Sequence, residues 1–162
     1  MAIKPIREVP EPVLRQKSKR VRIIDNSIKQ LVDDMLETLH AIPGRVGLAA
    51  PQVGVLLRVM VIGIPDKEDI ILINPEIVRK ANECLVSEGC LSVPGYIGEI
   101  ERADSVTVKG LDRNGKKIRV KANGYLAQAL QHEIDHLNGV LYIDHLESMD
   151  KLRKLDPEES EL

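Results

Sequence analysis

Hydrophobic residues recur at helical spacing in two stretches of the chain. In the first, apolar residues lie three or four positions apart until Pro43-Gly44 interrupts the pattern. This spacing predicts a helix with one apolar face that packs on a core. Ser27 would begin the helix, with Gln30 three residues later in a capping-box pattern. Its apolar positions are Ile28, Leu31, Val32, Met35, Leu36 and Leu39.

The second helical stretch lies between two Asn-Gly pairs. Asn123-Gly124 precedes it, and Asn123 is suited to cap a helix. Asn138-Gly139 follows it, and Gly139 is suited to the left-handed conformation that ends many helices. The apolar positions between the two pairs are Leu126, Leu130, Ile134 and Leu137. The pattern predicts a helix that is apolar on one side.

Most other apolar residues form short runs that are typical of strands. The aliphatic runs 55–64 and 70–73 indicate buried strands, and Asn74-Pro75 indicates a turn before another strand that begins at 76–78. Asn114-Gly115 predicts a hairpin turn. The remaining predicted strands cover 106–111, 117–122 and 141–143.

The two ends of the chain carry weaker patterns. Residues 1–20 hold three prolines among charges and predict an extended arm on the surface. Residues 144–154 predict a final helix, and the acidic tail from about 156 is expected to fray. Because hairpin-linked strands lie between helices, we expect an α+β fold: mostly antiparallel β-sheets around the helix that follows residue 123. We expect one catalytic domain over 1–162.

Composition excludes several classes of partner. The net charge is −2 and aromatic residues make up only 2%, with no Phe or Trp. The sequence therefore gives no direct signal for nucleic-acid binding, since stacking on bases needs aromatic platforms. No run approaches the roughly 18 apolar residues that span a bilayer, and residues 1–20 lack the apolar core of a signal peptide. We expect no membrane contact and a cytoplasmic location.

The second predicted helix carries His132, Glu133 and His136. Four-residue spacing places the two imidazoles on one helix face, where they can bind one metal ion with Glu133 beside it to carry protons. The same run also fits an ordinary polar helix face. Clustered histidines and a carboxylate near a core are costly without partners, which favours the metal site. Tyr125, Gln128 and Ala129 share the helix face of the histidines and should meet whatever binds there.

Cys90 is the best candidate for a third metal ligand. It lies about 40 residues before the histidines, between Gly89 and a Pro-Gly break, in a position typical of a bend at a strand end. A thiolate and two imidazoles leave a fourth tetrahedral position open. A free cysteine also fits a small buried apolar residue. Cys84, His145 and His40 are weaker candidates, because they fall in a strand, at the start of the last helix and at a helix end.

Three segments together resemble the motifs of the peptide deformylase family. They are the stretch from Gly44 to Gln52, which includes Val46-Gly47-Leu48-Ala49-Ala50-Pro51; the run Glu88-Gly89-Cys90-Leu91-Ser92; and Gln131-His132-Glu133 with Asp135-His136. They occur in the family's order and spacing, and the chain length also fits.

The resemblance implies removal of the formyl group from the initiator N-formylmethionine of newly made polypeptides. It implies that Cys90, His132 and His136 bind one divalent metal, with Fe²⁺ native and Zn²⁺, Ni²⁺ or Co²⁺ as substitutes. It assigns general acid/base catalysis to Glu133, and stabilisation of the oxyanion to Gln52 and the Leu91 N–H. The substrate-binding residues that it implies are Val46, Gly47, Gly89, Tyr125, Gln128 and Ala129. Some family members contact the ribosome through a basic C-terminal helix, and Lys151, Arg153 and Lys154 are basic here.

Two other functions fit part of the pattern. A zinc metalloprotease uses the same His-Glu-x-x-His run, but it takes its third ligand from downstream, where the sequence offers only His145. A purely structural metal site needs four protein ligands, and the sequence suggests only three.

Overall fold

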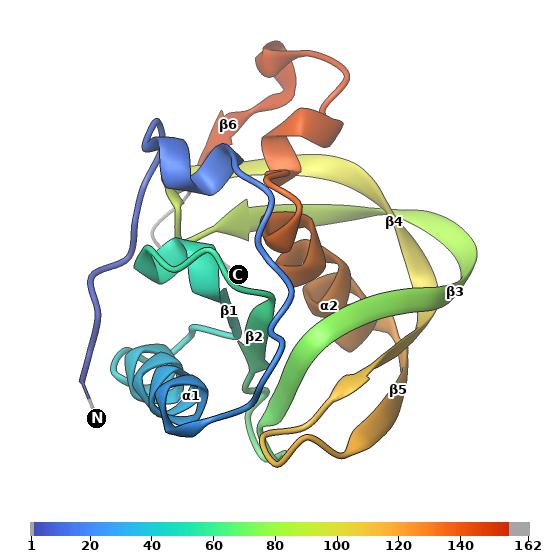
Figure 1. Ribbon diagram of the computed structural model, residues 1–162. Helices are drawn as coiled ribbons and strands as arrows, with labels where there is room; N and C mark the ends of the chain where they lie inside the picture. Colours follow the sequence, from blue (N-terminus) through green and yellow to red (C-terminus); the bar gives the residue numbers. More distant parts are fainter. Residues whose placement is uncertain (1, 156–162) are drawn as a thin grey trace.

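The computed structural model describes residues 2–155, in which two α-helices pack against one antiparallel sheet (Figure 1). Helix α1 is Asn26–His40 and helix α2 is Gly124–Leu137. The strands are β1 (Gly47–Ala49), β2 (Val59–Ile62), β3 (Ile70–Cys90), β4 (Val93–Leu111), β5 (Lys117–Asn123) and β6 (Arg153–Lys154). Four 3-10 helices, η1 (Pro12–Arg15), η2 (Ala50–Val53), η3 (Tyr142–His145) and η4 (Met149–Lys151), connect them. The strand order is β1-β2-β3-β4-β5, and β6 pairs with β4.

The β3–β4 hairpin shapes the molecule, because its two long strands curve around α2 (Figure 1). The predicted strands at 70–73 and 76–78 are parts of β3, which passes through Asn74 with a positive φ of 54° and a register shift between Ile73 and Glu76. Such bulges bend a strand without ending it. Strand β3 ends at Cys90, as expected, and the chain turns at once into β4.

Helix α2 lies inside the curve of the sheet and contributes to its main core. Ala127, Leu130 and Leu137 pack with Met60 and Val108 there. Helix α1 covers the other face of β1 and β2, where a second core contains Val32, Met35, Leu39, Leu48, Val59 and Val61. Strand β2 is therefore buried on both faces, which explains why its sequence is continuously aliphatic.

The helix ends differ partly from their predictions. Asp25, rather than Ser27, caps α1, and its side chain accepts a hydrogen bond from the Ile28 N–H. Asn123 lies at the N-cap of α2, but its side chain accepts a hydrogen bond from Ser105 instead. Gly139 has the predicted left-handed conformation, with a φ of 74°.

The α+β class and the antiparallel sheet are confirmed, but the final helix predicted over 144–154 is wrong. That segment contains η4 and then β6, which pairs with Tyr96 and Ile97 of β4. The strand predicted at 141–143 is also wrong, because the Asp144 carboxylate accepts the Leu141 N–H and closes the turn of η3. Only residues 59–62 of the predicted strand 55–64 are extended in the sheet. The predicted fraying from 156 lies outside the described residues. Within residues 2–155, no helix is long and apolar enough to cross a bilayer.

Candidate metal centre

Three side chains meet at the face of α2 that carries the two histidines. His132 and His136 lie one turn apart, and Cys90 reaches them from the end of β3. Nε2 of His136 lies 3.2 Å from Nε2 of His132 and 3.2 Å from Sγ of Cys90. Each of the three side chains is at most 1% exposed. The structure therefore brings together the sulfur and the two imidazoles that the sequence suggested.

The geometry of this cluster fits a tetrahedral metal ion. One ligand atom from each residue lies within 4.8 Å of the other two. An ion with bonds of about 2.0–2.1 Å to nitrogen and about 2.3 Å to sulfur holds such atoms roughly 3.3 to 3.6 Å apart. The observed spacings of 3.2 Å are close to this range. Three buried donors that converge in this way are suited to a metal with one open position.

Glu88 orients the first of the two histidines. Its Oε2 lies 2.6 Å from Nδ1 of His132, so Nε2 of the same ring is left to face Cys90 and His136. Arg102 donates to both oxygens of Glu88, and Gln128 donates to Oε1. Burial alone raises the pKa of Glu88, but His132 and Arg102 outweigh it and lower this pKa to about 2. Glu88 is therefore a buried carboxylate that stays ionised beside the metal ligand.

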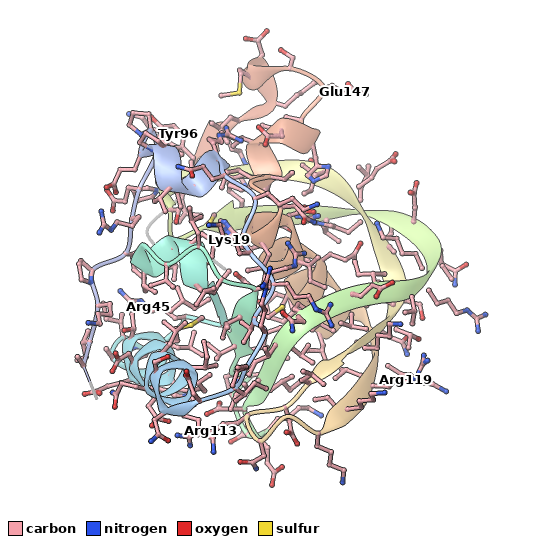
Figure 2. The ribbon with its side chains drawn as sticks, viewed as in Figure 1. Lys19, Arg45, Tyr96, Arg113, Arg119 and Glu147 are labelled. Carbon is pink, nitrogen blue, oxygen red and sulfur yellow. The ribbon has the colours of Figure 1, made fainter. Side chains whose placement is uncertain are left out.

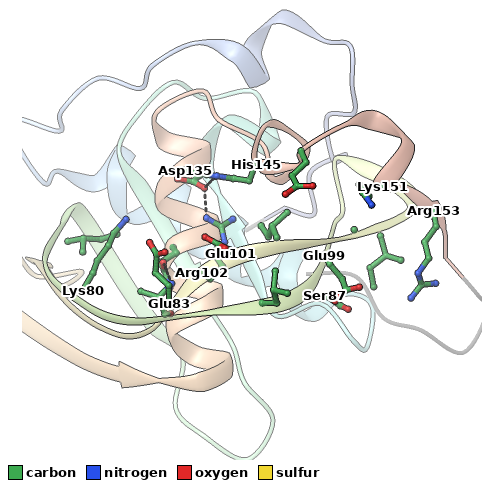
Figure 3. A pocket seen from close by; sticks show the side chains of 18 residues that line it. Lys80, Glu83, Ser87, Glu99, Glu101, Arg102, Asp135, His145, Lys151 and Arg153 are labelled. Atoms are coloured by element: carbon green, nitrogen blue, oxygen red, sulfur yellow. Dashed lines mark hydrogen bonds and ion pairs between the residues drawn. The ribbon is translucent and has the colours of Figure 1, made fainter.

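Arg102 also connects the centre to the surface. Its Nη1 donates to Oδ2 of Asp135 over 2.6 Å, and Nε2 of His145 lies 2.9 Å from the same oxygen. Figure 3 shows Arg102 and His145 both turned toward Asp135. His145 thus belongs to an ion-pair network and not to the metal cluster. Cys84 lies within β3, and His40 pairs with Asp69, so neither of these weaker candidates joins the cluster.

Glu133 lies next to the two histidines and is fully buried. Neither of its carboxylate oxygens has a hydrogen-bond partner among the residues that the structure describes. Burial raises its pKa to about 7, although the nearby His132 lowers it in part. The backbone of Gly47 lies against this carboxylate, since a Cβ atom at position 47 would be 2.5 Å from Oε2. A buried carboxylate without a protein partner is unusual and is typical of functional sites.

Gln52 links the turn after β1 to the cysteine. Its Oε1 accepts the Ala49 N–H at 2.9 Å, while its Nε2 lies 3.2 Å from Oγ of Ser92 and 3.8 Å from Sγ of Cys90. This amide thus makes two kinds of contact, one that supports the turn at Ala49 and one directed at the cysteine of the metal cluster. Leu91 occupies the turn between β3 and β4, directly after Cys90.

The residues expected to bind substrate lie around this cluster. Gln128 donates to the Ser87 carbonyl at 3.0 Å, and Tyr125 is about half exposed, at 47%, one turn before it. The remaining members of the expected set, Val46, Gly47, Gly89 and Ala129, are buried.

A family model described as "Polypeptide deformylase" matches residues 3–152. The chain belongs to this family. Its members are enzymes, and the family and its relatives support metal-dependent removal of the formyl group from N-formylmethionine.

Relatives of known name agree with the family assignment. The peptide deformylase of Dehalococcoides mccartyi strain CBDB1 is 58% identical over 160 residues, which cover 98% of this deformylase-family chain and 95% of the relative. The peptide deformylase of Thermomicrobium roseum is 46% identical and covers 99% and 96% of the two chains.

Solved structures of the family share the fold. A peptide deformylase from Legionella pneumophila superposes with a TM-score of 0.88 at 47% identity, over 93% of this chain and 89% of that one. The enzyme from Ehrlichia chaffeensis in complex with actinonin gives a TM-score of 0.89 at 42% identity, over 93% and 92% of the two chains.

Residues that support this deformylase site were not identified from the sequence. Glu88, Ser92 and Asp135 were part of the three motifs but had no role assigned, and Arg102 was not singled out. The available sequence signal for Glu88 was an acid two residues before the candidate metal ligand Cys90, since an acid buried at such a site needs a cationic partner.

Proposed function

We propose that this enzyme removes the formyl group from the initiator N-formylmethionine of newly made polypeptides and releases formate. The observation that carries the proposal is the convergence of Cys90, His132 and His136 beside the unpartnered carboxylate of Glu133. Such an arrangement combines a metal site that has an open position with a proton carrier, which is what hydrolysis of an amide requires.

Cys90, His132 and His136 would hold one divalent ion. We propose Fe²⁺ as the native metal, with Zn²⁺, Ni²⁺ or Co²⁺ as substitutes that the same donors accept. A thiolate and two imidazoles are donors that suit each of these ions. When bound, the ion acts as a Lewis acid that strengthens water as a nucleophile near neutral pH and polarises the formyl oxygen.

Glu133 would carry the proton. Its carboxylate takes a proton from the attacking water as the new C–O bond forms at the formyl carbon. It then gives that proton to the amine nitrogen as the C–N bond breaks, so formate and a free N-terminus leave together. The close backbone of Gly47 restricts where this carboxylate can lie.

Gln52 and Leu91 would stabilise the negative charge that develops on the former formyl oxygen. The Gln52 amide is fully buried and is held by Ala49, so one of its N–H groups is oriented in advance. The Leu91 N–H follows the cysteine directly. Donors fixed in this way are worth roughly 3 kcal/mol each in other enzymes.

The methionine side chain would lie along α2. Tyr125, Gln128 and Ala129 share the helix face of the histidines. Val46, directly before β1, Gly47 of β1 and Gly89 of β3 would complete the site. We further propose that residues 1–162 act as one catalytic domain in the cytoplasm and touch the ribosome transiently. The exposed basic residues Lys151 and Lys154, together with Arg153, would make that contact.

The test is formate release from a formyl-Met tripeptide under anaerobic conditions, with an N-acetyl-Met tripeptide and an unblocked longer peptide as comparisons. The proposal expects hydrolysis of the formyl peptide alone. Cleavage of an internal peptide bond in the longer peptide would instead indicate the zinc metalloprotease alternative. The position of His145 beside Asp135 disfavours that alternative, because it removes the only downstream histidine from the cluster.

A further inference from the structure

The outer face of the sheet, on the side away from α2, is strongly basic. The strand register places Glu76, Lys109 and Arg119 in one row across β3, β4 and β5. The next row contains Arg79, Thr107 and Lys121. Arg119 projects outward from β5 (Figure 2). Positive charges of neighbouring strands thus lie side by side with one carboxylate among them.

Two hollows of ≈ 670 and 380 Å³ lie along these two rows of the sheet, and a third of ≈ 360 Å³ lies beside the larger one at the N-terminal arm. The largest and the smallest share Arg20, Asn74 and Glu76, so the surface continues from the sheet to the N-terminal arm. We call this surface the basic groove. Its cationic lining residues are Lys17, Arg20, Arg58, Arg79, Lys109, Lys117, Arg119 and Lys121, and Glu76 is its one carboxylate.

Most of these cations are not neutralised by the protein. Lys109 lies 3.6 Å from Glu76, and Arg58 donates to the Leu137 carbonyl at 3.0 Å. The other six make no ion pair with any residue of the described range 2–155. Ser18, which is 5% exposed and lines the smallest hollow, has an Oγ without a partner among the same residues. The basic groove therefore offers charge and hydrogen-bonding capacity that nothing described satisfies.

The charge is not spread evenly over the molecule. The chain as a whole has a net charge of −2. A larger groove on the concave side of the β3–β4 hairpin mixes both signs, with Lys80 and Lys151 among Glu83, Glu99 and Glu101 (Figure 3). Arg79 and Lys80 are adjacent in sequence but line different grooves. The net charge of the chain does not indicate a basic surface, because the excess of acidic residues lies outside the basic groove.

We propose that the basic groove binds the phosphate backbone of a base-paired RNA. Unpaired lysine and arginine side chains along a concave surface are typical of a site that binds such a polyanion. The asparagine, serine and threonine side chains of the lining can add hydrogen bonds to it. The choice of RNA over other nucleic acids rests on the proposed function, since an enzyme that acts on newly made polypeptides works beside structured RNA.

The lining disfavours two other partners. It includes no aromatic residue on which single-stranded bases could stack. It also includes none of the exposed large hydrophobic residues of the described chain, which a membrane surface would require for insertion. The basic groove is separate from the basic residues at 151–154, which lie beyond η3 near β4.

The test measures binding of a fluorescein-labelled RNA stem-loop to the full-length, metal-loaded enzyme by anisotropy over a range of salt concentrations. The variant Lys117→Gln/Lys121→Gln removes two cations of the basic groove. The control variant Lys67→Gln/Lys80→Gln removes two exposed cations that lie outside the basic groove. Both changes alter the net charge equally, and none of the four residues belongs to the catalytic machinery.

We expect the wild-type enzyme to bind the stem-loop more tightly than a single-stranded RNA of equal length. The groove variant should bind about tenfold more weakly, and the slope of log K against log salt should fall by about 2, with the control unchanged. Equal weakening in both variants, or preference for phosphatidylserine vesicles over RNA, would overturn the proposal. Formate release should be the same in all three proteins, so a failure of the proposed function is detected separately.

Discussion

Oε2 of Glu88 lies 2.6 Å from Nδ1 of His132, and both side chains are almost completely buried. This contact determines which ring nitrogen of the histidine faces Cys90 and His136. Because Arg102 holds Glu88 through both oxygens, the ligand is oriented by a chain of contacts that begins on β4. The metal site is therefore built by the β3–β4 hairpin as much as by α2.

Substitution of Glu88 should weaken metal binding without removing a ligand. Glu88→Gln keeps the shape of the side chain but loses the charge that orients His132. Supporting carboxylates of this kind typically contribute 10- to 100-fold to metal affinity. Competition with a chelator should reveal a loss of that size. Glu83→Gln, at an exposed position of the same strand, is the control and should bind metal like the wild type. Equal affinity in Glu88→Gln would show that the contact is not needed.

The two cysteines of β3 should behave differently. Cys90→Ala removes the sulfur of the cluster, and we expect the purified protein to contain little metal. Cys84→Ala should retain it, because this partly exposed residue lies outside the cluster. Elemental analysis of both variants decides the question. Metal content that follows Cys84 would refute the ligand assignment.

Glu133→Gln should separate metal binding from turnover. The amide fills the same space but cannot carry a proton, so metal content should be normal while kcat falls by about 10²- to 10⁴-fold. Steady-state kinetics with a formyl-Met peptide measure the loss. If turnover remains normal, another group carries the proton.

Gly47→Ala tests whether the position of Glu133 matters. The added Cβ would lie 2.5 Å from Oε2 of Glu133, so the carboxylate must move. A misplacement of this order can cost about 100-fold in rate, with metal content retained. Gly63→Ala is the matched control, because its Cβ crowds the Asp69 and His40 side chains at 2.9 Å, away from the metal centre. Similar losses in both variants would point to general destabilisation rather than displacement of Glu133.

Sequence patterns gave correct predictions where the placement of a residue depends on a single helix or strand. Helical spacing was enough to place His132 and His136 on one face, and Gly139 marked the end of that helix. Cys90 was the preferred third ligand on local grounds, but its meeting with the helix depends on the path of β3. Glu88 and Arg102 could not be paired from the sequence, because their contact is made across the hairpin.

The errors in the predicted secondary structure also have physical causes. Strand β3 is long, and its middle part alternates weakly because residues 76–87 are all at least partly exposed. The segment after α2 has helical apolar spacing. The Asp144 carboxylate nevertheless closes a 3-10 turn, and Arg153 and Lys154 pair with β4 as a short strand. Tertiary contacts overrode local propensity at this end.

X-ray absorption spectroscopy of the zinc-loaded enzyme tests the central claim most directly. We predict one sulfur at about 2.3 Å and two imidazole nitrogens at about 2.0–2.1 Å from the metal. The sulfur signal should disappear in Cys90→Ala and persist in Cys84→Ala. A spectrum without sulfur bonded to the metal in the wild-type protein would contradict the proposed site.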